Sequence, residues 1–153
     1  MSDSKPDKLA ATLWLDTEFN GFGGALISMA LVDEAGASVY FALPCDNPVP
    51  WVAEHVLPAL GIAPTTRRAA QAVMRMFLHR FARANIVANW PDDIKHFCAF
   101  MVDGPAECLV VPPLTFELRM DLGGTADRSS APHNALQDAI ALRDIHMESL
   151  KPG

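Results

Sequence analysis

The stretch that decides the fold is LWLDTEFNGFGG, residues Leu13–Gly24. It opens with three apolar residues, which predict the inside of a β-strand. Asp16 and Glu18 follow two residues apart, and residues with that spacing in a strand point to the same face. Like charges that close repel one another unless a positive group joins them. The stretch therefore predicts a buried strand that leads into a site for something positively charged.

The composition is typical of a single globular domain. The chain has 153 residues, of which 50% are hydrophobic and 20% charged, and this length can bury a substantial core. We expect residues 1–8 to form a flexible, polar N-terminal tail and residues 9–153 to form one domain.

A cytoplasmic protein with no membrane partner is expected. The longest apolar runs, such as ALISMALV, are far shorter than the ~20 residues that a membrane-spanning helix needs. The N-terminus lacks the layout of a signal peptide, because its short apolar part runs straight into Asp16. The three cysteines show no CxxC spacing, which favours a reducing compartment.

The formal net charge of −6 argues mildly against a nucleic-acid partner, because a protein that holds nucleic acid by charge alone is usually basic. It does not exclude one. Carboxylates that bind metal ions count as negative in this sum and would be neutralised in use.

The order of expected elements is β-β-β-α-β-α-β-α, with Asp33–Ala37 as a hairpin turn and Leu122–Pro132 as a mobile loop. Three strands in a meander followed by alternating units predict an α/β fold with a mixed sheet flanked by helices. The expected strands are Thr12–Asp16, Ala25–Asp33, Ser38–Leu43, Ile86–Asn89 and an edge strand within Cys108–Leu118; the expected helices are Trp51–Leu60, Thr66–Ala84, Asp92–Val102 and Pro132–Leu150.

Further carboxylates lie where two later helices begin. Asp92 and Asp93 are adjacent at the start of the third expected helix, where either could simply cap the helix. Asp138 lies on a strongly apolar helix, and a carboxylate there is costly to bury without a partner. His133 precedes it by five residues, so the two side chains face one site only if His133 lies at or before the first turn.

The DTE sequence after an apolar strand, an Asp at the start of a middle helix and HNALQDA near the C-terminus together resemble a known family. The chain resembles the DEDDh 3′–5′ exonucleases of the ribonuclease H-like superfamily, most of all the small stand-alone bacterial 3′–5′ exoribonucleases. The resemblance covers nearly the whole chain. It implies a ribonuclease H-like mixed sheet and the release of 5′-mononucleotides from the 3′ end of single-stranded RNA.

The resemblance also implies a site. Its metal ligands would be Asp16, Glu18, Asp93 and Asp138, holding two Mg²⁺ or Mn²⁺ ions, and His133 would be the catalytic base. The middle motif departs from the family pattern, because NWPDDI offers two adjacent acids. Asp93 is the preferred ligand there and Asp92 the alternative.

Residues near the acidic pair are candidates for substrate binding. Phe19 and Phe22 would stack on terminal bases, although covering the edge of the core is an equally good interpretation. Asn20 is placed to meet the last sugar, because its amide both donates and accepts hydrogen bonds. A basic run on the second expected helix is either a solvated face or a nucleic-acid track. It consists of Arg67, Arg68, Arg75, Arg80 and Arg83.

The sequence is compatible with two other functions. One is a 3′–5′ DNA exonuclease of the proofreading or repair type. The other is a catalytically silent module that uses the same fold to bind nucleic acid or protein. A homodimer is possible and would set the basic helix of one subunit beside the site of the other.

The remaining aromatic and histidine residues are assigned no function. Trp51 and Trp90 are expected in the core. The other histidines show no zinc-ligand spacing and are expected to be structural or surface residues; they are His55, His79, His96 and His146.

Overall fold

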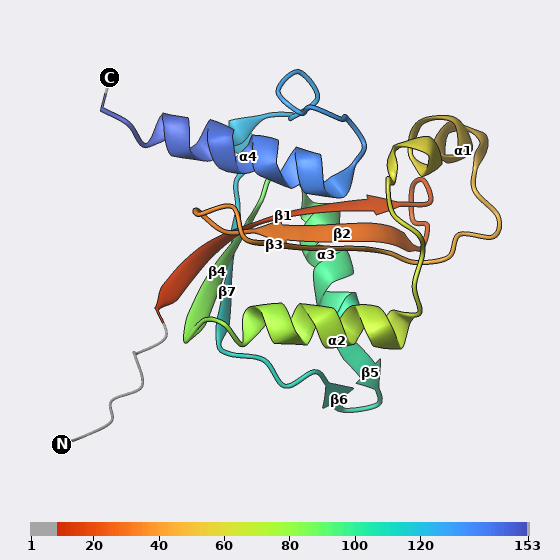
Figure 1. Ribbon diagram of the computed structural model, residues 1–153, viewed down its shortest axis with the longest axis horizontal. Coiled ribbons are helices and arrows are strands. Elements are labelled where there is room, and N and C mark those ends of the chain that lie inside the picture. The colour runs from red at the N-terminus through yellow and green to blue at the C-terminus, as the bar shows by residue number, and fades with distance from the viewer. Residues whose placement is uncertain (1–8, 153) are drawn as a thin grey trace.

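In a computed structural model, which describes residues 9–152, the chain forms an α/β fold built on a mixed five-stranded sheet in the order β3-β2-β1-β4-β7. Helix α4 covers one face of the sheet, and α2 and α3 cover the other (Figure 1). The sheet strands are β1 (Ala10–Phe19), β2 (Leu26–Val32), β3 (Ser38–Ala42), β4 (Arg83–Ala88) and β7 (Leu114–Leu118); the helices are α1 (Pro50–His55), α2 (Arg67–Leu78), α3 (Pro91–Phe100) and α4 (Ala135–Ser149).

Strand β1 lies at the centre of the sheet and is buried on both faces. It pairs antiparallel with β2 and parallel with β4, which makes the sheet mixed, as expected. Leu13 and Leu15 pack into the cluster beneath α2 and α3, whereas Trp14 packs into the cluster beneath α4. The alternation of a strand therefore assigns Asp16 and Glu18, which share the parity of Trp14, to the α4 face.

The strand extends further than expected. The predicted strand ended at Asp16, but β1 continues to Phe19 because Thr17 and Glu18 still pair with β2. Both acids therefore stand on regular backbone. The hairpin turn predicted at residues 33–37 is confirmed, and the side chain of Asp33 accepts a hydrogen bond from the N–H of Ala37 at 2.8 Å.

The second predicted helix was too long. Helix α2 begins after Thr66, whose hydroxyl accepts a hydrogen bond from the N–H of Ala69 at 3.1 Å, and it ends at Leu78 rather than Ala84. Arg83 and Ala84 belong instead to β4, where they pair with the start of β1. Sheet pairing thus overrides the helical pattern of the sequence, as tertiary context commonly does.

Three other boundaries differ from expectation. The edge strand expected within residues 108–118 is confirmed in a shorter form, because β7 lies at the edge of the sheet and begins only after the prolines at 112 and 113. A short hairpin of β5 (Val102–Gly104) and β6 (Glu107–Cys108) precedes it. The loop expected at residues 122–132 is preceded by a 3₁₀ turn, Met120–Leu122, and α4 begins at Ala135 instead of Pro132.

The burial of the tryptophans differs from the prediction. Trp51 and Trp90 were expected in the core, but their exposed fractions are 51% and 52%. Both stand at the first turns of helices that begin at an edge of the sheet. Trp14 is the buried tryptophan, and its Nε1–H donates a hydrogen bond to Nδ1 of His146 at 3.0 Å.

The tail predicted at residues 1–8 lies outside the described residues. Within residues 9–152, no helix has both the length and the apolar character required to cross a lipid bilayer.

Candidate metal and catalytic site

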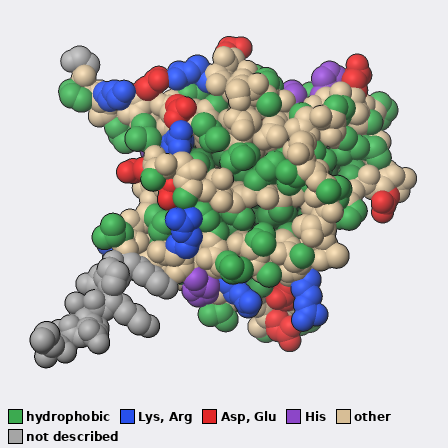
Figure 2. Space-filling model, viewed as in Figure 1, with side chains coloured by type: hydrophobic (Ala, Val, Ile, Leu, Met, Phe, Trp, Pro, Cys, Tyr) green, Lys and Arg blue, Asp and Glu red, His purple; other side chains and the backbone are tan. Residues whose placement is uncertain are grey.

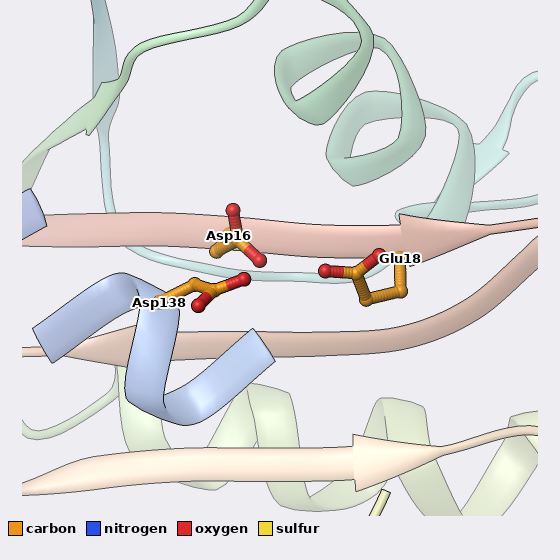
Figure 3. A group of neighbouring side chains, drawn as sticks. All are labelled: Asp16, Glu18 and Asp138. Carbon is orange, nitrogen blue, oxygen red and sulfur yellow. The ribbon is translucent and has the colours of Figure 1, made fainter. Parts of the chain in front are cut away.

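Three carboxylates meet between β1 and α4 (Figure 3). Asp16 and Glu18 point from the α4 face of β1, and Asp138 points toward them from the first turn of α4. One oxygen from each side chain lies within 4.8 Å of the others. Asp16 and Glu18 pair with Ala30 and Ser28 on β2. The small side chains of these two partners leave room for the three carboxylates.

Part of this acidic cluster lacks hydrogen-bond partners. Asp16 Oδ2 and Asp138 Oδ1 are buried, and neither finds a partner within residues 9–152; the same holds for Ser28 Oγ beside them. A buried carboxylate oxygen without a donor is costly. A bound cation would satisfy these atoms, and an all-oxygen donor set suits Mg²⁺ or Mn²⁺. The residues present therefore fit a divalent metal ion.

Burial and mutual repulsion raise the pKa values of the cluster. Burial is the largest cause for Asp16, followed by the charges of the neighbouring acids, and together they hold the pKa of Asp16 well above its usual range. For Glu18 the same two causes raise the pKa to about 9. Without a positive charge in the site, the cluster therefore retains protons at neutral pH.

The structure does not bring Asp93 into this compact cluster. Asp93 is buried, and its Oδ1 accepts a hydrogen bond from the hydroxyl of Thr17 at 2.6 Å. Thr17 faces the α3 side of β1, because it lies between Asp16 and Glu18 in the strand. The expected set of four converging carboxylates is thus three clustered acids plus one that approaches from the opposite face.

Asp93 is nevertheless electrostatically part of the site. Its charge helps to raise the pKa values of Asp16 and Glu18. Burial raises the pKa of Asp93 itself to about 7, although the hydrogen bond from Thr17 opposes this shift. The alternative ligand, Asp92, is partly exposed and accepts a hydrogen bond from Nε1 of Trp90 at 3.2 Å.

His133 lies before the first turn of α4, as its five-residue spacing from Asp138 required. Its backbone N–H donates to Oδ2 of Asp138 at 3.1 Å, and its φ of 72° is unusual for a residue other than glycine. Its ring contacts Trp51 edge-on, with 5.0 Å between ring centroids. A strained backbone at a position that the surroundings fix is common in functional sites.

Asn134 connects the start of α4 to the segment that follows α1. Its side-chain oxygen accepts a hydrogen bond from the N–H of Gln137 at 3.0 Å and so caps the helix. Its amide nitrogen donates to the carbonyl oxygens of Ala59 and Leu60. The segment after α1 and the residue that follows His133 are thereby held together.

The three candidate substrate residues, Phe19 at the end of β1 and Asn20 and Phe22 in the loop that follows, make different contacts. The amide of Asn20 donates to the carbonyl of Asn47 and accepts from the N–H of Val49, both at 2.8 Å. Asn20 therefore braces the loop in this structure, and its contact with a sugar stays a prediction. Phe19 stacks on His96 with 4.7 Å between centroids, whereas Phe22 is fully exposed.

Several residues near the site were missed or misjudged from the sequence. Thr17 gave no signal beyond its place in the DTE motif, yet its hydroxyl orients Asp93. Tyr40 lies on β3 across from Ala30. Burial and the charges of the acidic cluster raise the pKa of Tyr40 to about 12. The pattern of β3 alone could have placed Tyr40 on the α4 face.

The five arginines expected on one helix are divided in the structure, because α2 carries Arg67, Arg68 and Arg75, Arg80 follows the helix, and Arg83 lies on β4. Arg67 donates to the carbonyl oxygens of Ala99 and Phe100 at the end of α3, and Arg80 lies over the ring of Phe77. On the face seen in Figure 2, Lys and Arg side chains form separate groups near the margins and no continuous track. These observations favour the interpretation of a solvated face.

Comparisons with known proteins do not identify the chain. No family model matches it, and no curated protein matches its sequence.

The raised pKa values predict how the metal-free protein responds to pH. Folded Glu18 keeps its proton up to about pH 9, whereas an unfolded glutamate loses it near pH ~4.3. The folded state thus binds more protons between these values, so its free energy of unfolding falls as pH rises through this window. Thermal melts in EDTA should show a lower midpoint at pH 8 than at pH 5.5.

The matched variant is Glu18→Gln, which removes one of the titrating groups and should flatten this dependence. Mg²⁺ at pH 8 should raise the midpoint of the wild-type protein, because a ligand of the folded state alone stabilises it. A midpoint that is independent of pH in EDTA would show that the acids are not held protonated.

Proposed function

We propose that this chain is a metal-dependent 3′–5′ exonuclease of the DEDDh type, which releases 5′-mononucleotides from single-stranded RNA. The observation that carries the proposal is the acidic cluster with two buried carboxylate oxygens that lack partners. The mixed sheet with its three-strand meander is compatible with a ribonuclease H-like fold. His133, whose backbone N–H donates to Asp138, is the candidate base.

Each side chain has a role in this proposal. The clustered acids hold divalent ions, and Asp93, oriented by Thr17, completes a set of four negative charges suited to two ions. When bound, such ions lower the pKa of a water molecule and stabilise the departing oxygen of a phosphodiester. His133 accepts the proton that the attacking water loses.

The structure supports catalysis better than the silent binding module. Three carboxylates whose ligand oxygens lie within 4.8 Å of one another repel when they are ionised, and this destabilises the metal-free fold. A module that only binds nucleic acid has no need of them. The DNA exonuclease remains the second candidate, because the cluster would serve either polymer.

Replacing any clustered acid should nearly abolish activity. Asp16→Asn and Asp138→Asn should each lower kcat by more than about 10²-fold. Replacing a residue that only hydrogen-bonds to a metal ligand can already cost about 10²-fold in activity. Both variants should stay folded, because a source of repulsion is removed. The measurement is release of mononucleotides from a uniformly labelled RNA in Mg²⁺.

The exposed Asp127 supplies the matched control, since Asp127→Asn should leave the rate unchanged. Asp93→Asn and Asp92→Asn decide between the two middle acids. A fully active Asp93→Asn beside an inactive Asp92→Asn would reverse our assignment. Undiminished activity of the wild-type protein in excess EDTA would rule out the metal mechanism.

Loss of the imidazole of His133 should slow catalysis while the acids remain in place. His133→Ala should reduce kcat by about 10²–10⁴-fold, the usual contribution of a positioned base. It should also remove the acidic limb of the pH–rate profile, while Mg²⁺ still raises the thermal midpoint. An unaltered rate between pH 6 and pH 8 would assign His133 a structural role only.

Single-stranded RNA should be trimmed faster than DNA of the same sequence. One hydrogen bond to the terminal 2′-hydroxyl contributes about 0.5–1.5 kcal/mol, which corresponds to a rate difference of about 2- to 10-fold. The test compares RNA, DNA and RNA with a single 2′-deoxy residue at the 3′ end. Equal rates on all three would make the DNA exonuclease the better proposal.

A further inference from the structure

A cavity opens directly beside the acidic site. Its volume is about 450 Å³, within the range of small-molecule sites. It is lined by Trp90 in front of α3, by Met120 and by the loop of residues 123–126. It shares His133 and Asp138 with the acidic site, so a ligand in the cavity would lie next to the metal-binding carboxylates.

The chemistry of the lining selects the kind of ligand. No Lys or Arg is among the described residues that line the cavity, and Asp138 contributes negative charge. A phosphate group is therefore disfavoured there. Trp90 and Met120 are large apolar side chains that expose 52% and 53% of their surface, and a flat, uncharged ring can stack on such side chains.

The cavity is formed in advance rather than left to a mobile side chain. The ring of Trp90 is anchored through the hydrogen bond from its Nε1 to Oδ2 of Asp92. The amide of Asn89 donates to the carbonyl of Gly123 at 2.8 Å, which ties the loop to the end of β4. A Cβ added at Gly123 or Gly124 would meet nothing within 4 Å, so the loop leaves the cavity open.

We propose that this cavity binds a nucleobase, from one of the two nucleotides that flank the scissile phosphate, by stacking on Trp90. The inference rests on the proposed function and adds a substrate contact that the acidic cluster cannot supply. The acids and their ions hold the phosphate, which every nucleotide shares. Trp90 holds the base beside it.

The first test replaces Trp90. Trp90→Ala should raise KM for a single-stranded RNA oligomer by about 5- to 150-fold, the range found for loss of one stacked base, with kcat nearly unchanged. Trp90→Phe loses the hydrogen bond to Asp92 but keeps an aromatic face. Its KM should therefore stay close to that of the wild type. Met120→Ala should have a smaller effect than Trp90→Ala. Met76→Ala is the matched control, because Met76 is an exposed methionine on α2 away from the cavity.

A second test does not depend on activity or on the folding of the Trp90 variants. Gly124 lines the cavity, and a Cβ there would meet no atom within 4 Å. Gly124→Leu therefore adds a bulky side chain at the cavity wall and should weaken binding of the same RNA. Binding is measured by fluorescence anisotropy of labelled RNA with Ca²⁺ in place of Mg²⁺. The dissociation constants of Trp90→Ala and Gly124→Leu should both rise.

The outcomes separate this inference from the proposed function. Wild-type protein that cleaves RNA, with unchanged KM and dissociation constants in Trp90→Ala and Gly124→Leu, would overturn the base site alone. Wild-type protein that neither binds nor cleaves RNA would overturn the proposed function, and the base site with it. Weaker binding in Gly124→Leu supports the site even where Trp90→Ala fails to fold.

Discussion

The repulsion among three closely spaced carboxylates is the constraint on which the rest of the site depends. At the 4.8 Å that bounds their separation, each pair of ionised groups repels by roughly 3 kcal/mol at an effective dielectric constant of about 20. The fold must hold Asp138 against Asp16 and Glu18 in spite of this. It does so with contacts away from the acids, so that the cluster remains assembled and able to receive positive charge.

The contact between Trp14 and His146 is the clearest of these supports. Trp14 stands two residues before Asp16 on the same face of β1, and His146 stands eight residues after Asp138 on α4. Their hydrogen bond of 3.0 Å fixes the position of the helix along the strand about two helical turns from the acids. Asn134 fastens the other end of α4 to the segment after α1. The helix is thus held at both ends while its first turn carries Asp138.

The features that could be predicted from the sequence follow from local periodicity. The two-residue repeat of a strand placed Asp16 and Glu18 on one face, and the five-residue step placed His133 before α4. The errors arose where partners distant in sequence decide. Arg83, which was predicted in a helix, pairs with Ala10 in the sheet. The hydrogen bond from Thr17 to Asp93 also joins residues that are distant in the sequence, and the role of Asp93 as a metal ligand stays a prediction. The exposure of Trp90 depends on the loop that packs beside it, which no local pattern encodes.

If the proposed function holds, the distribution of charge shows how an acidic protein would bind a polyanion. The net charge is −6, and prominent arginines are already paired within the protein: Arg119 with Glu117 and Asp121, and Arg128 with Glu148. Attraction for phosphate would therefore come from metal ions held by the acids, and not from a basic surface. Recognition of the remainder of a nucleotide then falls to uncharged groups. Trp90, which is exposed and shares a cavity with Asp138, is a group of that kind.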